Sequence, residues 1–131
     1  MLGARMRLFG VSVVLLLTAC GTGGMGGAWF QGDYAKHELA VGVQRYEEGD
    51  YTAAVVMLQQ ALRDGLSNKG HQVRAHKYLA FSYCITAREK QCRNEFKKAL
   101  ETDPGFDLKP AEEGHPIWGP VFRSVKDKSA K

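Results

Sequence analysis

The feature of this 131-residue chain that most constrains its fold is a helical pattern that occurs twice. In each copy, small and apolar residues recur at spacings of three and four, which place them on one face of an α-helix. The copies align at a constant offset of 38 residues, so that Gly42, Ala54, Leu58 and Ala61 match Ala80, Cys92, Phe96 and Ala99. A repeat of this length predicts helix pairs that pack side by side, because one pair alone cannot bury its apolar face.

Five helices are predicted from this periodicity and from the residues that interrupt it. Gly49-Asp50, the segment 65–70 and Asp103-Pro104-Gly105 separate helices, since glycine is flexible and the residue before proline disfavours the α region. The predicted helices span residues 34–48, 51–64, 72–85, 89–100 and 117–126. Residues 105–116 are expected to be extended and turn-like. No strand-like alternation occurs in the sequence, so the expected class is all-α, with two helical hairpins and a C-terminal capping helix.

The repeated positions also predict how the helices pack. Small residues are expected where the two helices of a pair approach closely, and a larger side chain fills the space toward the next pair. The small residues are Gly42, Ala54, Ala80 and Cys92, and the larger ones are Leu58 and Phe96. The last helix is expected to bury Trp118, Val121, Phe122 and Val125.

This pattern resembles the tetratricopeptide repeat (TPR), a helical hairpin that stacks into a solenoid. Residues 73–104 match best, through Leu79-Ala80, Tyr83, Cys92, Phe96, Ala99 and Pro104. Residues 35–66 match through Gly42, Gly49-Asp50-Tyr51, Ala54, Leu58 and Ala61-Leu62. This first unit lacks the terminal proline and has Glu38 where tryptophan is common, and a longer loop makes the spacing of the two units four residues longer than the usual 34. The resemblance implies a short α-solenoid over residues 33–126.

A different pattern lies at the N-terminus. Arg5 and Arg7 precede an apolar run at residues 8–17, which is too short to cross a bilayer, for which about 20 residues are needed. The run ends in Leu17-Thr18-Ala19-Cys20, which resembles the lipobox of bacterial lipoproteins. The resemblance implies that residues 1–19 are a cleaved signal peptide and that Cys20 carries the acyl chains. The alternatives are an ordinary secretory signal and an uncleaved amphipathic start.

Residues 20–32 are expected to form a short tether, because five of the seven residues at 21–27 are glycine. Trp29 and Phe30 either cap the first helix or sit at the membrane interface, and we favour the cap. Gly21 follows the lipidated cysteine, where an aspartate favours retention in the inner membrane. The resemblance therefore implies an outer-membrane lipoprotein on the periplasmic face.

Removal of the signal peptide changes the charge of the protein. The whole chain has 18 basic and 14 acidic residues, and loss of Arg5 and Arg7 leaves 16 against 14, a net charge of +2. A charge this small argues against nucleic acid as a partner. The basic tail at 127–131 is expected to be a solvated terminus.

Residues that carry catalysis or bind metals form no recognisable pattern. His71 and His76 are five apart and lie on different faces of the predicted helix, and no nucleophile elbow or phosphate-binding loop occurs. We therefore expect neither enzymatic activity nor a metal or cofactor, apart from the lipid on Cys20. Cys84 and Cys92 flank a predicted tight turn and either form a disulfide or remain thiols, depending on whether their Cβ vectors converge.

The TPR resemblance implies a peptide-binding groove lined by the first helix of each hairpin. In this sequence the groove residues are Lys36, Leu39, Val43, Tyr46, Arg74, Lys77 and Phe81. An apolar strip with basic edges suits a peptide that has hydrophobic anchors and a carboxylate. The alternative is that Leu39, Val43 and Phe81 belong to the core between the hairpins.

Together these patterns predict a membrane-anchored periplasmic module that binds a protein partner in the cell envelope. Similar proteins are accessory or assembly lipoproteins of envelope complexes such as secretion systems, of type VI or pilotin-like. The alternative is a structural envelope lipoprotein that self-associates, because two repeats are fewer than the three that normally bury a continuous core.

Overall fold

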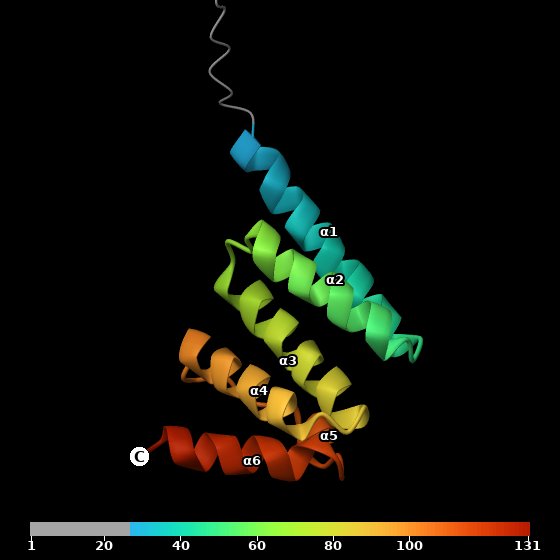
Figure 1. The fold of residues 1–131 in the computed structure, drawn as a ribbon. Helices are drawn as coiled ribbons and strands as arrows, with labels where there is room; N and C mark the ends of the chain where they lie inside the picture. Colours follow the sequence, from blue (N-terminus) through green and yellow to red (C-terminus); the bar gives the residue numbers. More distant parts are fainter. Residues whose placement is uncertain (1–26) are drawn as a thin grey trace, which may run out of the picture.

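The computed structural model describes residues 27–131, and the predicted signal peptide, Cys20 and the first part of the predicted tether lie outside this range. Within it, the chain forms helices and no strand, which confirms the all-α class (Figure 1). The helices are α1 (Gly27–Glu47), α2 (Tyr51–Asp64), α3 (Lys69–Ile85), α4 (Glu89–Thr102), α5 (Pro110–Glu113) and α6 (Trp118–Ser129).

The helices pack in hairpin-like pairs that lie side by side. Helices α1 and α2 form one antiparallel pair, α3 and α4 form the next, and α2 packs against α3 (Figure 1). Helix α6 packs along α4 and also contacts α3, which in turn contacts α1. As a result α3 lies in the middle of the domain, with neighbours on several sides.

The observed bounds of α2 are those predicted from the sequence, whereas each of the other predicted helices differs from its predicted range at one end or both. Helix α3 begins at Lys69 rather than residue 72, because the Asn68 side chain caps it by accepting a hydrogen bond from the His71 N–H at 3.1 Å. Helix α4 continues two residues beyond the predicted end at residue 100, to Thr102. Helix α6 extends to Ser129, so the predicted solvated tail at 127–131 begins as helix.

Two predictions about local structure are wrong. Helix α1 begins at Gly27, inside the predicted tether, and the Phe30 side chain is 66% exposed instead of capping the domain. The predicted extended segment 105–116 contains the short helix α5. Pro110 starts this helix with a suitable φ angle, and the Glu112 carboxylate accepts a hydrogen bond from the Lys109 N–H at 3.0 Å.

The predicted packing of small residues is confirmed. Ala54, Ala80 and Cys92 are fully buried, as are the larger Leu58 and Phe96. Gly42 marks the closest approach of α1 and α2, because a Cβ atom there would lie 2.7 Å from the Leu58 Cγ atom.

The last helix also buries the face that the sequence predicts. Trp118, Val121, Phe122 and Val125 are all buried. The Phe122 ring meets Phe96 of α4 at a centroid distance of 5.1 Å and Phe106, from the segment between α4 and α5, at 5.6 Å. Helix α6 is therefore part of the core and not a loosely attached terminus.

A buried ion pair joins α3 to α4. The Glu95 carboxylate lies 2.7 Å from the His76 Nδ1 atom and accepts a hydrogen bond from the Lys98 ammonium at 2.7 Å. Burial raises the pKa of Glu95, but the hydrogen bonds and charges of His76 and Lys98 outweigh burial and hold it below its usual value. This carboxylate therefore stabilises the fold above its unfolded-state pKa, and the contribution is lost as the pH falls through the folded-state value.

Cys84 and Cys92 form a disulfide, which resolves the alternative that the sequence leaves open. Cys84 lies in the last turn of α3 and Cys92 in the first turn of α4, with their Cα atoms 5.2 Å apart. The turn between them places Ala87 at a φ of 59° and closes with a hydrogen bond from the Arg88 N–H to the Tyr83 carbonyl at 2.8 Å. The two cysteines thus face each other across the hairpin.

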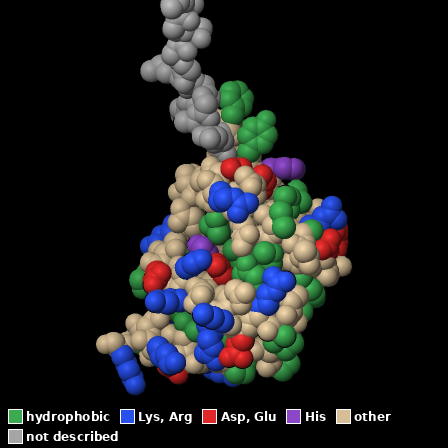
Figure 2. Space-filling view, in the orientation of Figure 1, with side chains coloured by type: hydrophobic (Ala, Val, Ile, Leu, Met, Phe, Trp, Pro, Cys, Tyr) green, Lys and Arg blue, Asp and Glu red, His purple; other side chains and the backbone are tan. Residues whose placement is uncertain are grey.

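Charged side chains of both signs are interspersed on the surface. Figure 2 shows Lys and Arg side chains spread over one face, with acidic side chains among them. Several of these charges form pairs along a helix, such as Arg93 with Glu89 at 2.6 Å. Pairs of this exposed kind contribute little to stability.

Replacing Gly42 by valine should destabilise the protein by about 1–3 kcal/mol, because the new side chain would overlap Leu58 in a packed core. Gly32 lies in the same helix and is the matched control, since nothing lies within 4 Å of a Cβ atom there. Gly32→Val should change the free energy of unfolding by less than about 0.5 kcal/mol. Chemical denaturation of both variants tests this, and equal effects would contradict the close approach at Gly42.

Removing the disulfide with the double variant Cys84→Ala/Cys92→Ala should lower the free energy of unfolding by about 2.5 kcal/mol, the entropy of closing an eight-residue loop. Reduction of the wild-type protein with dithiothreitol should produce a comparable loss, measured by urea denaturation. The free energy of unfolding of the double variant should not change with the reductant. If that of the wild-type protein is also unchanged, the predicted stabilisation by the bridge is contradicted.

Candidate protein-binding surface

The residues predicted to line a groove divide into buried and accessible groups. Leu39, Val43 and Phe81 are only 2–4% exposed, so they form core between the hairpins, as in the alternative interpretation of the sequence. Lys36 is exposed and pairs with Asp33 at 3.5 Å. The remaining predicted groove residues lie on α1 and α3, which contact each other. Tyr46 and Lys77 are half-buried, and Arg74 is exposed.

The C-terminal segment covers the groove side of α3. The Trp118 ring stacks on Phe81 with a centroid distance of 4.2 Å and an interplanar angle of 20°. The Trp118 indole N–H donates a hydrogen bond to the Glu112 carbonyl at 2.8 Å, which fixes the ring. The Phe81 side chain is therefore inaccessible to a partner protein.

The Lys77 side chain is also engaged within the protein. Its ammonium lies 2.8 Å from a carboxylate oxygen of Glu112, and the two side chains are only 12% and 19% exposed. The same ammonium lies 5.0 Å from the centre of the Tyr78 ring, close enough for a cation–π interaction. The hydrophobic anchor and the carboxylate predicted for a partner peptide are thus supplied by Trp118 and Glu112 of the protein itself.

A cluster of half-buried tyrosines remains beside the covered groove. The Tyr46 ring meets Tyr51 at a centroid distance of 5.6 Å and Tyr78 at 5.1 Å in an edge-to-face arrangement. We call these three residues the tyrosine cluster. It joins the end of α1 and the start of α2 to the middle of α3. Burial, together with Tyr51, Tyr78 and Glu112 nearby, raises the pKa of Tyr46, so its hydroxyl stays protonated and can donate a hydrogen bond.

Arg74 gives the tyrosine cluster a positive edge. Its guanidinium lies 5.9 Å from the centre of the Tyr78 ring, and the side chain is exposed. It forms no ion pair with any residue in the described range 27–131. An arginine held over an aromatic ring and free of an internal carboxylate is well suited to accept one from outside.

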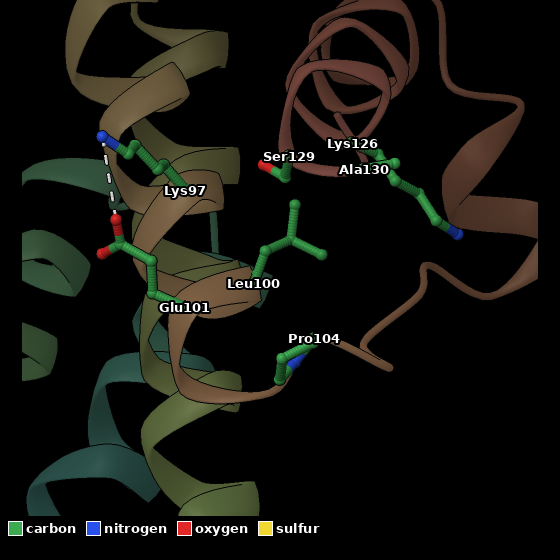
Figure 3. A pocket seen from close by; sticks show the side chains of 7 residues that line it. All are labelled: Lys97, Leu100, Glu101, Pro104, Lys126, Ser129 and Ala130. Carbon is green, nitrogen blue, oxygen red and sulfur yellow. Dashed lines mark ion pairs between the residues drawn. The ribbon is translucent and has the colours of Figure 1, made fainter.

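A shallow cleft of about 410 Å³ lies between the ends of α4 and α6. It is lined by Lys97, Leu100, Glu101, Pro104, Lys126, Ser129 and Ala130. Figure 3 shows Leu100 pointing into this space, whereas the Lys97 ammonium turns away toward Glu101 and Lys126 extends away from the opening. The cleft therefore presents an apolar floor with no charged group aimed into it, and it lacks the chemistry for a specific polar ligand.

Two further features of residues 27–131 bear on function. No three His, Cys, Asp or Glu side chains among them gather in a way that could hold a metal ion. None of the helices that they form has the length and hydropathy needed to pass through a bilayer.

Comparison with known proteins identifies no family for this chain. No protein-family model, curated protein or solved structure matches it. The TPR and lipoprotein resemblances thus rest on the sequence patterns themselves, and the surface has to be judged by its chemistry.

Two members of the tyrosine cluster, Tyr51 and Tyr78, were not among the predicted groove residues. Tyr78 follows Arg74 by four residues, so helical periodicity alone places it on the same face as Arg74 and one position from Lys77. That signal was available in the sequence. The covering role of Glu112 and Trp118 was not, because it depends on how the segment after α4 folds back.

Proposed function

We propose that the protein is a lipid-anchored envelope lipoprotein that binds a protein partner and acts as an accessory or assembly factor of an envelope complex, such as a secretion system. The lipobox ending at Cys20 supports the anchor, and Gly21 supports the periplasmic face of the outer membrane as its location. The observation that carries the binding role is the tyrosine cluster with the exposed, internally unpaired Arg74 at its edge.

We also propose that the helical hairpins are a short TPR-like solenoid. The 38-residue repeat supports this, as does the pattern of helix contacts. Helix α3 contacts both α1 and α6, while α2 packs between α1 and α3, and α4 packs between α3 and α6. In this arrangement α1, α3 and α6 form the inner layer, and α6 takes the place of the first helix of a third hairpin.

The partner proposed is a protein segment that offers an apolar or aromatic side chain next to a carboxylate. Tyrosine and arginine supply most of the energy in many protein interfaces, because they combine large apolar area with polar contacts. The tyrosine rings would accept the apolar group, and Arg74 would pair with the carboxylate. Such a site is small, so we expect a contact of moderate affinity that is reinforced by confinement at the membrane.

In-cell photocrosslinking tests the binding surface. A benzophenone amino acid replacing Tyr78 should crosslink one dominant envelope protein, identified by mass spectrometry. The matched control is the same probe at Val56, a 51% exposed residue of α2. Arg74→Glu should lower the crosslink yield at position 78 at least about tenfold, which corresponds to the loss of a charge-assisted contact worth about 1.4 kcal/mol.

The possible adducts distinguish the alternatives. Adducts with a second copy of the chain would favour the self-associating structural lipoprotein. Equal adducts at positions 78 and 56, or no adduct at position 78, would contradict the proposed surface.

Metabolic labelling with a palmitate analogue tests the anchor. The wild-type protein should incorporate the label and fractionate with outer membranes, and Cys20→Ala should lose both properties. Cys84→Ala/Cys92→Ala is the control, because it removes the other two cysteines and should remain labelled. Label that persists in Cys20→Ala would contradict the lipoprotein assignment.

A further inference from the structure

The start of α1 carries two exposed aromatic side chains. Phe30 is 66% exposed and Tyr34 is 65% exposed, and a spacing of four places them on the same face of the helix. Among the α1 residues whose burial the structure describes, Ala35 is the first that is buried. Figure 1 shows that this end of α1 extends past α2, and Figure 2 shows hydrophobic side chains standing clear of the domain at that end.

Exposed aromatic side chains in this position are costly in water. A phenylalanine and a tyrosine each have a large apolar area that folding usually buries, and here the protein leaves both uncovered next to each other. The nearest charges, Asp33 and Lys36, form an exposed ion pair at 3.5 Å and can remain in water or among the lipid headgroups. Something outside residues 27–131 is therefore expected to cover this end of the helix.

The position of these side chains relative to Cys20 indicates what covers them. Cys20 and Gly27 are seven positions apart, and bond geometry limits the distance between them to about 25 Å even when the chain is fully extended. If Cys20 carries acyl chains, as proposed above, the start of α1 is held within this distance of the bilayer. The aromatic pair then lies close along the chain to the lipid-bearing residue, within the first two turns of α1.

We infer that Phe30 and Tyr34 contact the bilayer surface and form a second attachment point beside the acylated Cys20; this inference rests on the lipid anchor proposed above. Aromatic side chains favour the membrane interface, where a ring reaches apolar chains and a tyrosine hydroxyl reaches water and headgroups. The acyl chains already confine the protein to the membrane, so a small apolar contact suffices to set its orientation.

A second copy of the chain is a poorer occupant. A stable protein interface needs about 800 Å² from each partner, and an aromatic side chain buries about 150–250 Å². Phe30 and Tyr34 together fall well short of that area. Lipid contact has no such threshold, because the anchor rather than the aromatic pair provides the attachment.

This contact gives the domain a defined orientation. Tyr46 lies sixteen residues after Phe30 on the same helix, which corresponds to about 24 Å along the helix axis. With the first turns of α1 at the bilayer, the tyrosine cluster lies at the opposite end of the same helix. The proposed partner surface would thus face the periplasm.

The test uses the full protein, purified with its anchor and placed in vesicles of phosphatidylethanolamine and phosphatidylglycerol. A benzophenone amino acid is introduced at Phe30, at Tyr34 or, as a control, at Val56, another exposed apolar residue. Lipid adducts are expected at positions 30 and 34 and are expected to be absent at position 56. Intact-mass measurement of the same samples reports whether Cys20 is acylated.

Each outcome decides the inference. Lipid adducts confined to positions 30 and 34 on an acylated protein would support it. Acylated protein with no lipid adducts at these positions, or with adducts to a second copy, would overturn the inference and leave the proposed function standing. Protein that lacks acyl chains at Cys20 would overturn the proposed anchor and, with it, the premise of the membrane contact.

Discussion

The stacking of Trp118 on Phe81 joins the C-terminal helix to the central helix of this domain. Phe81 lies in the middle of α3 and is 2% exposed. Besides Trp118, its ring meets Tyr46 of α1 at 6.0 Å and Phe96 of α4 at 6.1 Å. Four helices therefore converge on one aromatic ring. Aromatic contacts of this kind add to the hydrophobic gain from burial, so the packing of the C-terminal segment and that of the two hairpins depend on each other.

This convergence also determines which surfaces are open to other molecules. Because α5 and Trp118 cover the side of α3 that would line a groove, the accessible chemistry shifts to the tyrosine cluster and Arg74. The aromatic pair at the start of α1 remains outside the core because the hairpin begins only at Ala35. The tyrosine cluster and the aromatic pair thus lie near opposite ends of one helix. A rigid helix between a membrane contact and a partner site would fix the distance between them.

The sequence predicted the parts of the fold that arise from periodic burial. The small residues at Gly42 and Ala80 and the inward face of the last helix were found correctly, since each follows from helical spacing. The starts of α3 and α5 were missed because they depend on single capping side chains, Asn68 and Glu112, whose hydrogen bonds outweigh the flexibility of nearby glycine or proline. The disulfide between Cys84 and Cys92 could not be decided beforehand, because a bridge requires the directions of both side chains across the turn.

By itself, the sequence determined that this is an all-α chain of repeated hairpins, because the positions of small and apolar residues restrict which helix faces can be buried. It also supplied the resemblance to a lipobox at residues 17–20, on which the proposed membrane anchor rests, since that is a local pattern. Only the tertiary structure decided which predicted groove residues are core and which remain exposed. Periodicity shows that a side chain such as Phe81 leaves the helix on an apolar face, but whether a partner or the protein itself covers that face depends on where Trp118, some 37 residues later, folds back.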